Sequence, residues 1–106
     1  MSLRVNTSTG SSAILTTVSP GADFALESIS LHLSAAGGAG NLTVTIDAAA
    51  GAAYDVALPT QDMTSIANLF WQPERPIELS KDDKVVVAWA NASGRTYGLI
   101  VRYRGR

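Results

Sequence analysis

The chain has 106 residues, 46% of them hydrophobic and 16% charged, and its formal net charge at pH 7 is −1. This length predicts one domain, the absence of cysteine excludes disulfides, cysteine-bound zinc and thiol catalysis, and the negative charge without a dense Lys/Arg cluster argues against nucleic-acid binding. No apolar run approaches the roughly 20 residues that a membrane-spanning helix needs, and the N-terminus lacks the apolar core of a secretory signal.

The beginning of the chain is small and polar and includes a flexible Gly-Ser-Ser run. We expect residues 1–12 to form a flexible N-terminal arm and residues 13–106 to form a single β-sandwich domain. The arm has too few apolar residues to fold on its own, but Leu3 and Val5 suit a short strand that adds to a neighbouring molecule. The sequence therefore predicts that the arm becomes ordered only in an assembly.

Two strands are predicted in the next part of the chain. The first covers 13–18 and ends at a Ser-Pro-Gly turn signal. The second covers 24–34, where the apolar residues shift from even to odd positions. Because a strand places alternate residues on opposite faces, this shift predicts a β-bulge near Glu27 and Ser28.

Four strands follow. Residues 41–47 alternate between apolar and polar side chains, which is typical of a half-buried strand. A shorter strand is predicted at 54–58, ended by Pro59, and another at 65–71. Residues 76–79 predict a short edge strand, followed by a polar turn.

The last third of the chain carries the strongest structural signal. Two β-rich runs, 84–90 and 96–104, flank the turn-forming stretch 91–94 and predict a β-hairpin. Both faces of the first run are apolar, so we expect this strand to be central and covered on both sides. The whole pattern predicts an all-β fold, an antiparallel two-sheet sandwich of about eight strands with jelly-roll topology.

The sequence contains no recognisable set of reacting residues. His32 is the only histidine, and no nucleophile and acid are gathered near it in the sequence as a catalytic triad requires. The acidic residues lack calcium-loop spacing, and the Gly-rich run 36–40 is not followed by the helix of a phosphate loop. We therefore expect no enzymatic activity, no cofactor, and no catalytic or metal-binding residues.

Carbohydrate binding is the alternative function that the residues allow, because exposed aromatic side chains can serve as a platform for sugars. The candidate aromatic residues are Tyr54, Trp71, Trp89, Tyr97 and Tyr103. Most of them have strand spacing that suits a core, which makes this the weaker hypothesis.

The charges are unevenly distributed along the chain. All charged residues in 5–74 are acidic, and all those from Lys84 onward are basic. Arg102 and Arg104 share one face of the final predicted strand. Since the guanidinium group binds carboxylates through two parallel hydrogen bonds, we expect both arginines to contact carboxylates on a sister subunit or another partner.

A small sandwich also has exposed edge strands, and this chain has little edge lysine to protect them. Pairing these edges in an assembly would cover them. We therefore expect a homo-oligomer, with a trimer favoured.

Several segments together resemble small β-sandwich virion structural proteins of tailed bacteriophages. These segments are ESISLHLS (27–34), NLTVTID (41–47), AYD (53–55), WQP (71–73) and the stretch 90–99. The resemblance covers most of the chain from Phe24 to Arg104, but it is a pattern without a catalytic signature.

The resemblance implies a non-enzymatic component of the virion, assembled in the bacterial cytoplasm. The expected role is capsid decoration or another accessory role in the head or tail. The expected partners are further copies of the chain and a phage major capsid or other virion protein, with no nucleic acid and no membrane.

Overall fold

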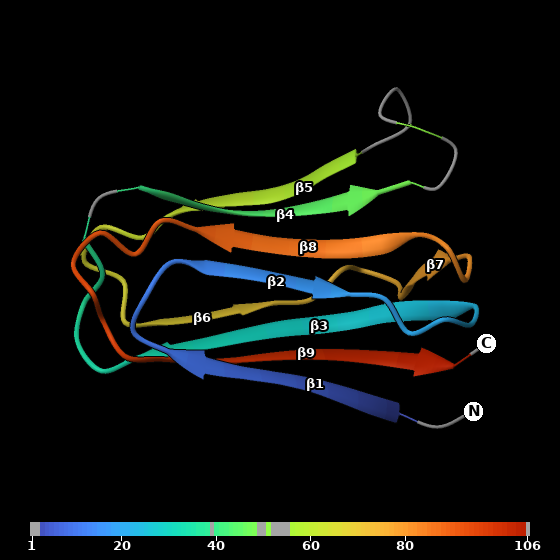
Figure 1. The fold of residues 1–106 in the computed structure, drawn as a ribbon, viewed down its shortest axis with the longest axis horizontal. Coiled ribbons are helices and arrows are strands. Elements are labelled where there is room, and N and C mark those ends of the chain that lie inside the picture. Colours follow the sequence, from blue (N-terminus) through green and yellow to red (C-terminus); the bar gives the residue numbers. More distant parts are fainter. Residues whose placement is uncertain (1–2, 39, 49–50, 52–55, 106) are drawn as a thin grey trace.

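The computed structural model describes residues 3–38, 40–48, 51 and 56–105, and these form nine strands and no helix (Figure 1). The strands are β1 (Leu3–Gly10), β2 (Ile14–Val18), β3 (Phe24–Leu33), β4 (Asn41–Asp47), β5 (Val56–Asp62), β6 (Asn68–Trp71), β7 (Ile77–Leu79), β8 (Lys84–Trp89) and β9 (Tyr97–Gly105). The predicted all-β class is confirmed.

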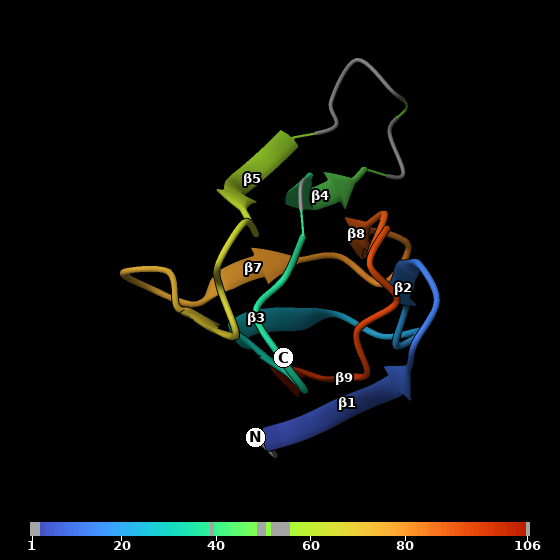
Figure 2. The ribbon, with the colours of Figure 1, turned by 90° about the vertical axis from the view of Figure 1, so that its left-hand side faces the viewer.

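The strands form two antiparallel sheets packed face to face. The five-stranded sheet has the order β1-β9-β3-β6, with β7 pairing to β3 beyond the end of β6, and the four-stranded sheet has the order β2-β8-β4-β5. Figure 2 shows the two layers nearly along their strands. With β6 and β7 sharing one position, this order is that of an eight-position jelly roll, as predicted.

The core lies between the sheets because apolar residues alternate with polar ones along most strands. In β4, for example, Leu42, Val44 and Ile46 are buried while the residues between them are only partly covered. β3 keeps its apolar residues inward through a register shift between Leu26 and Ser28. This shift is the predicted bulge, and it lets both halves of one strand face the same core.

The predicted hairpin at 84–104 is wrong. β8 pairs with β2 and β4, whereas β9 pairs with β1 and β3, so residues 90–96 cross from one sheet to the other. Buried Asn91 holds this crossing: its side-chain amide donates to the carbonyl oxygens of Ser12 and Arg95, both at 2.9 Å, and its Oδ1 accepts from the Arg95 amide at 3.0 Å. The turn residues do reverse the chain, but they join two layers.

The prediction that the strand at 84–90 is covered on both sides also differs from the structure. β8 is central in its sheet, but only one of its faces lies against the core. Val86 and Ala88 on the other face are partly exposed. The apolar residues on the second face of β8, Val86 and Ala88, are therefore small side chains that point away from the core.

The beginning of the chain differs from the expected flexible arm. Leu3–Gly10 is a regular strand, β1, which pairs with β9 of its own chain over eight register positions. The hydroxyl of Thr9 donates to the Tyr97 carbonyl oxygen at 2.7 Å, and the hydroxyls of Ser8 and Thr16 lie 3.2 Å apart, which links the two sheets. Backbone pairing orders this segment, and it does not need the apolar side chains that the segment lacks.

Two strand boundaries also differ from prediction. β5 begins at Val56 and continues through Pro59 to Asp62, whereas positions 54 and 55 of the predicted strand lie outside the described residues. Pro59 lies where the pairing of β5 with β4 shifts register, on the outer strand of the sheet, and such a position does not require an amide donor. β6 begins only at Asn68, because Ser65 adopts a left-handed turn with φ of 64°.

Candidate functional site on the five-stranded sheet

We use the term outer face for the side of the five-stranded sheet that points away from the core. Its middle row runs across four neighbouring strands, from Thr7 on β1 to Ile100 on β9, Ser30 on β3 and Phe70 on β6. Because side chains alternate along each strand, the residues two positions away form parallel rows. One such row contains Thr9, Gly98, His32 and Asn68, and the row on the other side contains Val5, Arg102 and Ser28.

Two large apolar side chains are exposed on this face. Phe70 is 61% exposed and Val5 is 51% exposed. They lie on the two outer strands β6 and β1, with partly exposed Ile100 between them. Exposed apolar groups that share one face mark an interaction surface more often than isolated ones do.

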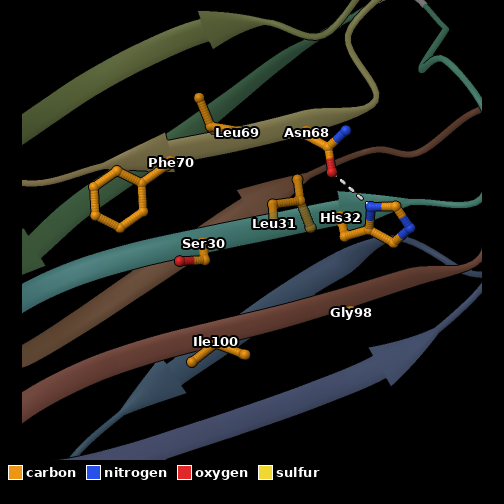
Figure 3. A pocket seen from close by; sticks show the side chains of 8 residues that line it. All are labelled: Ser30, Leu31, His32, Asn68, Leu69, Phe70, Gly98 and Ile100. Carbon is orange, nitrogen blue, oxygen red and sulfur yellow. Dashed lines mark hydrogen bonds between the residues drawn. The ribbon is translucent and has the colours of Figure 1, made fainter.

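Phe70 borders three hollows of the surface. The largest, about 480 Å³, has Ser30 and Gly98 among its lining residues (Figure 3). A second hollow, of about 290 Å³, lies toward Glu27 and Arg102. A third, of about 150 Å³, reaches core residues such as Leu42 between β5 and β6. The Phe70 ring therefore projects from the surface between these hollows.

The polar groups around the largest hollow contact one another. Nδ1 of His32 donates to Oδ1 of Asn68 at 2.6 Å, which Figure 3 shows at one end of the hollow. Nη1 of Arg102 donates to the hydroxyl of Ser30 at 3.1 Å. Each contact holds one atom of the His32 ring or of the Arg102 guanidinium within the chain.

The four residues that the sequence assigned to a partner interface come together here. The pairing of β1 with β9 sets Leu3 opposite Arg104 and Val5 opposite Arg102, although the side chain of Leu3 is not described. Arg104 forms an ion pair with Glu27 of the same chain. A carboxylate partner for Arg104 thus exists within the chain, and contacts of either arginine with another molecule stay a prediction.

Phe70 is the residue that the sequence analysis missed. The signal was present, because Leu69 and Trp71 both pack against the core and alternation then places Phe70 outside. Of the aromatic residues considered as a sugar platform, Trp89 and Tyr97 are buried and Tyr54 is outside the described residues. Trp71 and Tyr103 pack against the core as partly buried side chains.

Within the described ranges, no three His, Cys, Asp or Glu side chains gather closely enough to hold a metal ion. No helix in the described part of the chain is long and apolar enough to cross a membrane. No protein-family model matches the sequence, and a search of curated proteins gives no match.

Proposed function

We propose that this chain is a non-enzymatic structural protein of a bacteriophage particle, a capsid-decorating or other head or tail accessory protein, whose outer face is a contact surface in the assembled particle. The resemblance of several segments to virion structural proteins of tailed phages supports the particle role. The observation that carries the contact role is Phe70, which is 61% exposed and borders three hollows.

A binding role agrees with the state of the polar groups on this face. His32 is hydrogen-bonded to Asn68, and the hydroxyl of Ser30 accepts a hydrogen bond from Arg102. A hydrolytic triad would need a histidine that accepts the proton of a nucleophile and is oriented by an acid. The observed contacts instead favour a rigid surface, with Phe70 as an aromatic anchor of the kind that dominates protein interfaces.

The particle role is tested by locating the protein in purified virions. We expect mass spectrometry to find it at many copies per particle. We also expect Phe70→Ala to lower its occupancy at least tenfold, while Leu15→Ala on the opposite sheet changes occupancy less than twofold. Absence of the wild-type chain from purified particles would contradict the proposal.

Carbohydrate binding is the second candidate, and one observation favours it. Phe70 presents an exposed ring close to His32 and Asn68, and such a ring could stack on a sugar. A glycan array with the purified chain tests this function. Binding that is abolished by Phe70→Ala in a folded variant would support it, and an array without hits would remove it.

A further inference from the structure

We propose that two copies of this chain pair through their outer faces, so that Phe70 of each copy fills the hollow beside Ser30 and Gly98 of the other. This inference extends the proposed function but is tested on the isolated protein. It follows from the shape of the face, the state of its polar groups and its size.

The first argument is self-complementary shape. Phe70, Ser30 and Ile100 lie in one row on β6, β3 and β9, and Figure 3 shows Phe70 and Ile100 on opposite sides of Ser30. Neighbouring strands are about 4.8 Å apart, so Phe70 and β9 are separated by roughly 10 Å. A two-fold axis that crosses β3 obliquely between Ser30 and His32 would therefore place each Phe70 over β9 of the partner, beside Gly98. A symmetric dimer uses the same patch twice, and this patch holds both a projection and its receptor.

The second argument is the depth of the receptor. The hollow of about 480 Å³ is lined by the short residues Ser30 and Gly98 and bounded by Phe70 and Ile100. A Cβ atom added at Gly98 would meet nothing within 4 Å, so the space above β9 is open at that point. An aromatic ring from a second sheet can enter this space while the two sheets lie about 10 Å apart, the usual separation of packed sheets.

The third argument is electrostatic. Burial of a polar group is costly when its hydrogen bonds to water are not replaced. Here His32 bonds to Asn68, Arg102 bonds to Ser30, and Glu27 neutralises Arg104, all within one chain. Each of these groups therefore keeps one hydrogen bond or ion pair when an identical face covers it.

The size of the face is suitable for a stable pair. The sheet is four strands wide, and β9 has nine residues. At about 4.8 Å per strand and 3.3 Å per residue, the face covers roughly 600 Å² in projection. Side-chain relief raises the accessible area above this projection, toward the roughly 800 Å² per partner of standard interfaces.

Sedimentation equilibrium on the purified full chain tests the pairing. We expect twice the monomer mass of 11.1 kDa at high concentration. Phe70→Ala removes the projection and Gly98→Val fills the receptor, so each should raise the dimer dissociation constant at least tenfold. The matched controls are Gly105→Val, also on β9 with nothing within 4 Å of an added Cβ, and Leu15→Ala on the other sheet. Both controls should leave the constant within twofold.

Cross-linking tests the position of the axis. Since the chain has no cysteine, Ser30→Cys creates a single thiol close to the proposed axis. A short bis-maleimide should join two such chains, and it should not join Leu15→Cys chains under the same conditions.

Four results would overturn the inference. These are a monomer at all concentrations, a trimer, a dimer unaffected by both Phe70→Ala and Gly98→Val, and a monomer that binds a glycan through Phe70. The outcome is separate from the virion test, because a monomer found in virions refutes the pairing alone and a dimer absent from virions refutes only the particle role.

Discussion

The two sheets present different surfaces to the surroundings, although both follow the same alternation. The opposite face, on the four-stranded sheet, has the rows Leu15-Ala88-Thr43 and Thr17-Val86-Thr45, in which every side chain except Leu15 is short or β-branched. Leu15 is 74% exposed, which is more than Phe70 at 61%. Exposure of one apolar residue therefore does not distinguish the proposed contact face from the opposite one. The outer face differs in its uneven surface, on which the large Phe70 ring lies next to the short residues Ser30 and Gly98. Its polar groups also form hydrogen bonds with one another, as His32 does with Asn68.

The largest expected effect comes from breaking the connection between the two sheets, because both faces are then lost together. Asn91→Ala would remove three part-buried hydrogen bonds in the crossing loop, to backbone groups of Ser12 and Arg95. We expect the free energy of unfolding to fall by roughly 2–3 kcal/mol. Urea denaturation measures this loss, with exposed Asn41→Ala as the control. A loss below about 0.5 kcal/mol would show that the loop does not depend on this side chain.

A second prediction separates the effect of Gly98 on the surface shape of β9 from its effect on the stability of the fold. Glycine weakens the interior of a strand, so Gly98→Val should raise the free energy of unfolding by about 0.5–1 kcal/mol, because an added Cβ meets no atom within 4 Å. The measurement is urea denaturation at concentrations too low for association. A variant that is more stable but less associated would show that Gly98 serves the surface, whereas a destabilised variant would mean that the space above β9 is not open.

A third prediction concerns the charge on the outer face. Arg104 and Glu27 form a partly exposed ion pair, and such pairs contribute about 0.5 kcal/mol or less. A double-mutant cycle with Arg104→Ala and Glu27→Ala should give a coupling energy of that size, and the coupling should weaken as salt is added. Arg75→Ala with Glu27→Ala serves as the uncoupled control. Equal coupling in both cycles would exclude a specific contact.

The smallest effect belongs to the four-stranded sheet, at the end of β5. The Thr64 amide donates to the Asp62 carboxylate at 3.0 Å, and this bond, with a smaller contribution from the Thr64 side chain, lowers the pKa of Asp62. A lowered folded-state pKa stabilises the fold above the unfolded pKa, and this stabilisation is lost as pH falls through the folded pKa.

NMR titration of the Asp62 carboxyl carbon checks this prediction. The midpoint should be lower in the folded chain than in the urea-denatured chain. Thr64→Ala should raise the folded midpoint only in part, since the backbone bond remains. Identical folded and denatured midpoints would contradict the assigned cause.

The sequence predicted those features that depend on one strand and its own core contacts. The alternation at 41–47 defines β4 without error, because one face of that strand meets the core and the other does not. The bulge in β3 was visible for the same reason, since a change of parity has no other explanation in a strand that stays buried.

The features that failed depend on which strands become neighbours. A turn between 84–90 and 96–104 reverses the chain in the same way whether the strands pair or lie in separate sheets. β1 was missed because its partner is the distant strand β9. The hollow beside Phe70 could not be predicted for a similar reason. It forms where Gly98 lies next to His32 in one row, and only the pairing of β9 with β3 brings these two residues together.

The position of β9 has a consequence for how the chain is made. It lies between β1 and β3, so the five-stranded sheet cannot close until the last strand in the sequence has left the ribosome. The Leu3–Arg104 pairing spans almost the whole chain, and a topology dominated by such distant pairs folds in milliseconds to seconds rather than microseconds. Among the nine described strands, β1 therefore waits longest for its partner during synthesis, and until β9 is made the nascent chain exposes an unpaired β-segment.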